Sequence, residues 1–264
     1  KEKPDFVLVY GDTNSTLAGS LAAAKLHIPI AHVEAGLRSF NKKMPEEVNR
    51  VLTDHLSELL FVPTSVAVKN LKKEGINVNK IKIVGDVMYD AALHFGKIAE
   101  EKSKILEKLN IENNQYILAT VHRPENTDHP EKLKNIISAL SDSPLRVVMP
   151  IHPRTKKKIN DYNIQHNNQL EFIEPVGYLD IVMLEKNACK IATDSGGIQK
   201  EAYFHGVPCI TMRDETEWIE LIEMGANQIV GSSREKIRQA LYNNIDKFET
   251  NSVYGTGDTS LKII

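Results

Sequence analysis

The sequence has little of several features that point to particular classes of protein. It contains only two cysteines, Cys189 and Cys209, and both lie in apolar runs without the spacing of metal ligands. We therefore expect free buried thiols in a reducing cytoplasm, and no metal site or disulfide. No apolar run approaches the roughly 20 residues that span a bilayer, so we expect no membrane-spanning segment.

An excess of charge of either sign is also absent. The chain has 33 basic and 35 acidic residues and a net charge of −2. Because nucleic acids and anionic membranes attract basic surfaces, this balance favours neither as a partner. The 264 residues, 41% hydrophobic and 26% charged, are typical of a globular protein with two modest domains or one large one.

The sequence does contain a repeated alternation of short apolar segments, polar turns and amphipathic helical patterns. Nine apolar segments, from DFVLVY (5–10) to PCITMR (208–213), follow this rhythm. It predicts right-handed βαβ units and therefore doubly wound parallel sheets with helices on both faces. A charge-rich helical segment from His94 to Leu109 has the character of a connector. We expect three parts: the remaining part of an N-terminal Rossmann-like domain at 1–92, a second Rossmann-like domain at 93–250, and a C-terminal tail with a helix, 251–264, that returns toward the first domain.

The first apolar segment raises a question about the beginning of the chain. A continuous apolar strand such as DFVLVY is of the kind that is buried inside a parallel sheet, with neighbours on both sides. We therefore expect that an N-terminal portion of the first domain is not part of this sequence. The alternative is a natural first strand.

Candidate site residues lie at the carboxyl ends of the predicted strands, where open α/β sheets bind their ligands. In TDSGGIQKEA, Ser195, Gly196 and Gly197 begin a predicted helix directly after an apolar strand. Unpaired N–H groups at a helix start favour an anion, and glycines let a diphosphate approach the backbone. Glu201 follows on the same helix, where a carboxylate can accept hydrogen bonds from ribose hydroxyls. We interpret this segment as a nucleotide-diphosphate site; the alternative is a helix cap with glycines for tight packing.

Acidic residues follow the strands of the first domain. Asp12 lies in YGDT, Glu34 ends IAHVE, and Glu46 and Glu47 begin a predicted helix in MPEEVNR. A single carboxylate at such a place is often a helix cap, but carboxylates on successive connections of one sheet indicate general acid–base chemistry.

Basic residues follow the strands of the second domain. His122 and Arg123 come after YILATV, and His152 and Arg154 come after LRVVMPI. Each could cap a strand end. Their shared position in the half that carries the glycine turn favours a role in anion binding.

Together these segments resemble a known family. HVEAGLRS with MPEEVNR, then VHRPEN, TDSGGIQKEA and MRDETEW, are similar in order and spacing to the non-hydrolysing UDP-N-acetylglucosamine 2-epimerases, over essentially the whole chain. The resemblance implies a GT-B architecture, with a cleft between two Rossmann-like domains. It also implies inversion at C2 of UDP-GlcNAc to UDP-ManNAc, by anti elimination of UDP and its re-addition. The resemblance implies a cytoplasmic homodimer and does not imply a cofactor.

The resemblance also assigns roles to the candidate residues. Asp12, Glu34, Glu46 and His122 match the catalytic residues of the family, and Ser195, Gly196, Gly197 and Glu201 match positions that bind UDP-sugar. Arg123 and His152 also count as UDP-sugar-binding candidates, because they match positions near an allosteric UDP-GlcNAc site in some bacterial members. The spacing from Glu34 selects Glu46 rather than Glu47. Which carboxylate is the acid and which the base stays open.

Some positions depart from the better-known branch of the family. Trp218 stands where that branch has an arginine, and Val176 and Ile181 replace a glutamine and a phenylalanine. These departures resemble relatives that act on UDP-2,3-diacetamido sugars or their uronic acids. Four alternatives therefore stay open: such a substrate, a hydrolysing epimerase, a GT-B glycosyltransferase, and a truncated, inactive fragment that binds UDP.

Overall fold

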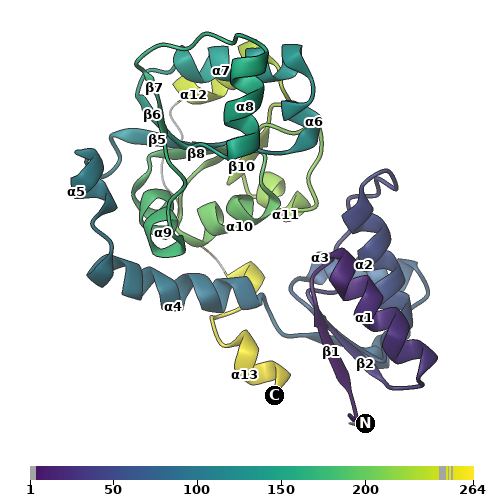
Figure 1. Ribbon diagram of the computed structural model, residues 1–264. Coiled ribbons are helices and arrows are strands. Elements are labelled where there is room, and N and C mark those ends of the chain that lie inside the picture. The colour runs from purple at the N-terminus through teal and green to yellow at the C-terminus, as the bar shows by residue number, and fades with distance from the viewer. Residues whose placement is uncertain (1–3, 244–247, 249, 251) are drawn as a thin grey trace. The chain divides into compact units, whose positions relative to one another are not determined.

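The computed structural model describes residues 4–243, 248, 250 and 252–264 (Figure 1). It divides into a first unit, residues 1–91 and 251–264, and a second unit, residues 92–250. Residues 1–3, 244–247, 249 and 251 lie outside the described residues. Residue 251, where the C-terminal tail was predicted to begin, is one of them.

The first unit is built on four parallel strands in the order β1-β2-β3-β4. Its strands are β1 (Val7–Tyr10), β2 (Ile30–Val33), β3 (Leu59–Val62) and β4 (Ile81–Ile83). Its helices are α1 (Asn14–Lys25), α2 (Pro45–Leu56), α3 (Ser65–Lys73) and α13 (Thr259–Ile263), with short 3-10 turns η1 (Val78–Lys80) and η2 (Ser252–Tyr254). One further helix, α4 (Val87–Lys102), starts in the first unit and ends in the second.

The second unit contains six parallel strands in the order β10-β9-β8-β5-β6-β7. They are β5 (Tyr116–Thr120), β6 (Arg146–Pro150), β7 (Leu170–Ile173), β8 (Lys190–Thr193), β9 (Cys209–Thr211) and β10 (Asn227–Ile229). The helices are α5 (Ile105–Leu109), α6 (Pro124–Thr127), α7 (Pro130–Ser141), α8 (Pro153–Asp161), α9 (Tyr178–Asn187), α10 (Gly196–Phe204), α11 (Ile219–Glu223) and α12 (Arg234–Tyr242).

The second sheet is covered by helices on both faces (Figure 1). Successive side chains of a strand point to opposite faces, so β5 contributes to two separate cores. Ile117 and Ala119 pack in the core that contains residues of α7, α8 and α12. Tyr116 and Leu118 pack in the core that contains residues of α5, α9 and α10. This double burial explains why the segment YILAT is continuously apolar rather than alternating.

Local sequence signals set where the helices start. The side chains of Thr13, Thr64 and Ser195 accept N–H groups from the first turns of α1, α3 and α10. Pro45 occupies the start of α2, where its missing N–H costs nothing, and two glutamates follow it in the positively polarised first turn.

The C-terminal segment completes the first unit. The N–H of Asp86 donates to the carbonyl oxygen of Tyr254 at 2.9 Å. The carboxylate of Asp90 accepts the N–H of Thr259 at 3.1 Å and the N–H of Ser260 at 2.8 Å. Tyr254 and Thr259 are both buried, so this segment belongs to the core packing of the unit rather than lying loosely on it.

The predicted α/β fold of two parallel-sheet domains is confirmed. The second sheet reverses its strand order between β8 and β5, as a doubly wound sheet does, whereas the described strands of the first sheet run from β1 to β4 without a reversal. All nine predicted apolar segments are strands, whereas β10, whose residues Gln228 and Ile229 are exposed, was not predicted. Both cysteines are free. Within the described residues, no helix combines the length and apolar character needed to cross a membrane.

Candidate active site

The first group of site residues lies where β1 and β2 end side by side. Gly11 follows β1 with a left-handed φ of 61°, and Glu34 follows β2 with a φ of 72°. The N–H of Gly11 donates to the carbonyl of Val33 at 3.1 Å, which fixes the two turns against each other. A Cβ on Gly11 would lie 3.3 Å from the Glu34 carboxylate, so the side chain of Glu34 lies directly over the residue that precedes Asp12.

A left-handed backbone is unusual for a glutamate and costs on the order of 1 kcal/mol or more. Glu34 is held there because its N–H and that of Ala35 both donate to the carbonyl of Phe61 at 3.1 Å. The sheet thus imposes a strained conformation on a carboxylate at the carboxyl end of an internal strand, which is typical of a functional position.

Asp12 is bound to helix α2. Its carboxylate forms an ion pair with Arg50, and its carbonyl oxygen accepts the side-chain amide of Asn49 at 2.9 Å. Glu46 lies four residues before Arg50 and therefore on the same face of α2. The structure thus brings Asp12 and Glu34 together at adjoining strand ends and attaches Asp12 to the helix that carries Glu46.

Glu46 and Glu47 have different environments. Glu46 is half-buried. Glu47 is 3% exposed and accepts the N–H groups of Ser39 and Phe40 at 2.8 and 2.9 Å, and it pairs with Arg50 at 3.0 Å. Phe40 has a left-handed φ of 60°, so Glu47 stabilises a strained loop. This is a structural role, and it agrees with the choice of Glu46 as the candidate for chemistry.

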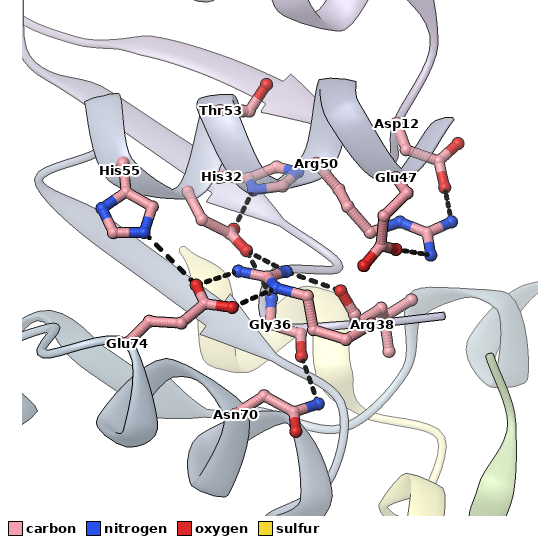
Figure 2. A network of polar contacts seen from close by, with 12 residues as sticks. Asp12, His32, Gly36, Arg38, Glu47, Arg50, Thr53, His55, Asn70 and Glu74 are labelled. Atoms are coloured by element: carbon pink, nitrogen blue, oxygen red, sulfur yellow. Dashed lines mark hydrogen bonds and ion pairs between the residues drawn. The ribbon is translucent and has the colours of Figure 1, made fainter. Parts of the chain in front are cut away.

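A network of polar side chains around His32, Arg38 and Glu74 lies beside Asp12 and Glu47 (Figure 2). The imidazole of His32 on β2 contacts Asp54 of α2 through Nδ1 at 2.7 Å and the carbonyl oxygen of Gly11 through Nε2 at 2.8 Å. Arg38 donates to the other oxygen of Asp54 at 2.7 Å.

Arg38 also makes a two-pronged pair with Glu74, with both N–O distances 2.7 Å. Hydrogen bonds from the Arg38 guanidinium hold the pKa of Glu74 below its usual value. Sequence analysis did not identify Arg50 or this network, because the partners are far apart along the chain.

In the second unit the carboxylate of Asp194, fully buried at the end of β8, organises the turn after β5. It accepts the N–H groups of His122 and Arg123, each at 3.0 Å, and the side-chain amide of Asn126 at 3.1 Å. The Nδ1 atom of His122 lies 3.4 Å from the same carboxylate. Asp194 therefore fixes the position of two predicted site residues and directly precedes a third, Ser195.

The imidazole of His122 has a lowered pKa. Burial is the main cause, and the positive Arg123 and the neighbouring His152 contribute, against an opposing effect of Asp194. The ring centroids of His122 and His152 lie 6.3 Å apart. His152 is exposed and caps α8, where its Nδ1 accepts the N–H of Arg154 at 3.2 Å.

The glycine turn is the start of α10, as predicted. The Ser195 hydroxyl accepts the N–H of Ile198 at 3.5 Å, and the N–H of Ser195 donates to the Thr193 hydroxyl at 2.9 Å. In the part of the chain that the structure describes, the N–H groups of Gly196 and Gly197 have no protein acceptor. Two unpaired donors at the positive end of a nine-residue helix suit a phosphate group.

The segment MRDETEW packs against this turn. A Cβ on Gly196 would lie 2.6 Å from Glu217, which pairs with Arg213 at 3.1 Å. The indole N–H of Trp218 donates to the carbonyl of Gly196 at 3.0 Å, and the ammonium of Lys200 lies 4.3 Å from the Trp218 ring centroid. Arg213 is a candidate anion-binding residue that sequence analysis did not select, although it is the last residue of a predicted apolar segment and lies within a quoted motif.

Glu201 lies further along α10 and accepts the Tyr178 hydroxyl at 3.4 Å. Its pKa is raised, mainly by burial. Behind it, Glu185 of α9 is fully buried, and its pKa is raised well above the usual value by burial and by the charge of Glu201. Neither carboxyl oxygen of Glu185 has a hydrogen-bond partner among the described residues.

The described residues contain no group of three or more histidine, cysteine, aspartate or glutamate side chains placed to hold a metal ion. Two parallel-sheet units, one with acidic residues after its strands and one with a helix that starts at two glycines, define a GT-B-type α/β protein. The chain belongs to the UDP-N-acetylglucosamine 2-epimerase family, whose model matches residues 1–264.

Individual proteins are similar over the same range. A UDP-N-acetylglucosamine 2-epimerase homolog of Methanococcus maripaludis is 57% identical over 100% of this chain and 75% of its own length. The UDP-2,3-diacetamido-2,3-dideoxy-D-glucuronate 2-epimerase of Pseudomonas aeruginosa is 49% identical over 100% of this chain and 74% of its own length. The crystal structure of the Methanocaldococcus jannaschii UDP-GlcNAc 2-epimerase, in complex with UDP-GlcNAc and UDP, has a TM-score of 0.90 and 47% identity, and the match covers 99% of this chain and 75% of that one.

Proposed function

We propose that this protein is a UDP-N-acetylglucosamine 2-epimerase, which reversibly inverts C2 of UDP-GlcNAc to give UDP-ManNAc. The observation that carries the proposal is the convergence of Asp12 and Glu34 at adjoining strand ends, with Asp12 tied to the helix that carries Glu46. A proton next to an acetamido group is weakly acidic, so its removal requires a positioned carboxylate base.

The reaction is an anti elimination followed by re-addition. One carboxylate among Asp12, Glu34 and Glu46 removes the C2 proton, and the C–H electron pair forms a C1=C2 double bond as the C1–O bond to UDP breaks. UDP departs with the electrons of that bond. Return of a proton to the opposite face of C2 and attack of the diphosphate oxygen on C1 complete the inversion. Protons and electrons balance without an external oxidant or reductant, so we propose that no cofactor takes part.

The second unit supplies the groups for the nucleotide. In this proposal the N–H groups of Gly196 and Gly197, with the Ser195 cap, bind the diphosphate, and Glu201 accepts hydrogen bonds from the ribose hydroxyls; the unpaired N–H groups at the start of α10 support it. In this proposal His122 and Arg123 stabilise the charge of departing UDP, with His152 as a further basic group; the hydrogen bonds of both backbone N–H groups to Asp194 and the nearby ring of His152 support it. We further propose that the protein acts as a homodimer in the cytoplasm. Light scattering after size-exclusion chromatography tests the oligomeric state.

The test is incubation of the protein with UDP-GlcNAc in deuterated water, followed by NMR. We expect UDP-ManNAc and deuterium at C2 of both sugars. Asp12→Asn and Glu34→Gln should each abolish deuterium uptake while leaving the Kd for UDP nearly unchanged, because both side chains lie in the other unit from the proposed nucleotide groups. Near-normal uptake in both variants would remove the carboxylates from the mechanism.

The same assay decides among the alternatives. Release of free ManNAc indicates a hydrolysing epimerase, transfer to an acceptor indicates a glycosyltransferase, and UDP binding without any reaction indicates an inactive fragment. A second substrate class has specific support, because the Pseudomonas relative acts on a UDP-diacetamido-glucuronate and is 49% identical. Faster inversion of that sugar nucleotide than of UDP-GlcNAc would assign the protein to it.

A further inference from the structure

The histidine beneath the acidic strand ends has a specific relation to the Asp12 turn. His32 on β2 is fully buried, and its Nε2 lies 2.8 Å from the carbonyl oxygen of Gly11. A carbonyl oxygen only accepts hydrogen bonds, so Nε2 carries a proton and donates it. This bond fixes the orientation of the peptide group that joins Gly11 to Asp12.

The orientation of this peptide group matters because Gly11 is a flexible point. Its φ of 61° is accessible to glycine without strain, and glycine also tolerates the alternative conformations that would turn Asp12 elsewhere. The Glu34 carboxylate lies against the same residue. A rotation of the Gly11–Asp12 peptide therefore displaces Asp12 and removes the surface on which Glu34 rests.

The other ring nitrogen of His32, Nδ1, also contacts a buried group. Nδ1 lies 2.7 Å from Oδ1 of Asp54, while Oδ2 of Asp54 accepts the N–H of Gly36 at 3.1 Å and a guanidinium N–H of Arg38 at 2.7 Å. Asp54 therefore joins the imidazole to Arg38 and to the backbone of Gly36. Glu74 holds Arg38 in turn through two bonds of 2.7 Å.

We propose that His32 is a positioning residue for the epimerisation, in which the chain Glu74–Arg38–Asp54–His32 holds the Gly11 carbonyl and thereby sets the geometry of Asp12 and Glu34. The proposal rests on the proposed function. His32 does not touch the substrate in this role. Its contribution is to keep the proton-transfer groups within reach of C2, where a displacement of about 1 Å can cost on the order of 100-fold in rate.

Two substitutions of His32 distinguish the contact at Nε2 from the contact at Nδ1. The amide nitrogen of His32→Gln can reach the position of Nε2 and keep the bond to Gly11. The shorter His32→Asn places its amide near Nδ1, so it keeps the contact with Asp54 and loses Gly11. We expect His32→Asn to lower kcat on the order of 100-fold with KM for the sugar nucleotide changed less than about 3-fold, and His32→Gln to retain kcat within about 10-fold of the wild type.

The matched control is His27→Asn, because His27 is an exposed histidine of the same unit outside the network and its φ of 58° suits asparagine. It should keep the wild-type kcat. The affinity of all variants for UDP should also be unchanged, which shows that the second unit is intact. Equal losses of kcat in His32→Asn and His32→Gln, or wild-type kcat in a folded His32→Asn, would overturn the proposal.

A measurement on the wild-type protein is independent of both folding of the variants and activity. NMR of protein with ¹⁵N-labelled histidine and ¹³C-labelled glycine should show a slowly exchanging Nε2–H of His32 with a coupling across the hydrogen bond to the Gly11 carbonyl carbon. Absence of that bond contradicts the positioning role even if the enzyme is active. An inactive wild type that retains the bond contradicts the proposed function instead.

Discussion

At the scale of single residues, two adjacent glutamates at the start of α2 have separate tasks. Glu47 is buried and holds the strained backbone of Phe40, while Glu46 is half-buried on the helix face that carries Arg50. Adjacent residues on a helix point about 100° apart, so Glu47 can serve the fold while Glu46 faces a different direction.

The pair Glu46→Gln and Glu47→Gln tests this separation. For Glu46→Gln we expect kcat to fall about 100-fold or more, with little change in the thermal midpoint. For Glu47→Gln we expect a loss of about 3 kcal/mol in stability, because Arg50 loses a buried ionic partner. Calorimetry and the deuterium-uptake assay measure the two effects. Similar stability losses in both variants would contradict the assignment.

The buried carboxyl of Glu185 makes the stability of the second unit depend on pH. Its pKa in the folded state is raised by burial and by the charge of Glu201. The folded protein therefore binds a proton at pH values where the unfolded chain has lost it, and stability falls as pH rises from the ordinary glutamate value toward the raised one. The slope is about 1.4 kcal/mol per pH unit for one such group.

Glu185→Gln should remove this slope. The neutral amide resembles the protonated carboxyl in shape, so we expect the variant to gain stability over the wild type at pH 8 and little at pH 4. Urea denaturation followed by the fluorescence of Trp218, the single tryptophan, reports on the second unit. A difference between the proteins that is constant with pH would contradict the expectation.

At the scale of elements, the start of α10 depends on close contact with the segment after β9. A methyl group on Gly196 would lie 2.6 Å from Glu217, itself 7% exposed and paired with Arg213, so the pair has to move. We expect Gly196→Ala to weaken UDP binding about 10-fold through displacement of the helix start. Gly177→Ala is the control, because its methyl group meets nothing within 4 Å. Calorimetric titration with UDP measures both, and equal affinities would show that the turn is not the diphosphate site.

The elements were predictable from local patterns to a large extent. Continuous apolar runs such as YILAT identified the strands, and Ser195 before two glycines identified the start of α10. The three-residue strand β10 was missed because its exposed edge residues, Gln228 and Ile229, carry no burial pattern.

The site was predictable only where its residues follow strands. Asp12 and Glu34 were selected for that reason. Arg50, which pairs with Asp12 from 38 positions away, and Asp54, which pairs with His32 from 22 positions away, were not. Such contacts depend on the register of α2 against the sheet, and no local sequence pattern encodes that register.

At the scale of the whole molecule, the first unit is assembled from two distant parts of the chain. Gly85, with a φ of 96°, lies so close to the C-terminal segment that a Cβ would meet the Thr259 hydroxyl at 2.7 Å and the Tyr254 carbonyl at 2.8 Å. We expect Gly85→Ala to release this segment and to speed amide hydrogen exchange in α13 and around Asp90. Gly75→Ala is the matched control, because its φ of 83° imposes the same backbone strain with nothing within 4 Å of the added methyl group.

Hydrogen exchange read by mass spectrometry distinguishes the two variants. Gly75→Ala should lower the free energy of unfolding by about 1 kcal/mol, because alanine is strained at a left-handed φ, and the amides of α13 should stay protected from exchange. Equal protection of α13 in both variants would mean that the close approach at Gly85 is not required for docking.

The same arrangement has a consequence for biosynthesis. Tyr254 and Thr259, buried in the first unit, are translated only after the whole of the second unit. On the ribosome, the second unit can therefore reach its native packing before the segment with Tyr254 and Thr259, which the first unit requires, has been translated. A chaperone that shields nascent chains should therefore still hold the β1–β4 region after the second unit has folded, although β1–β4 is translated before that unit.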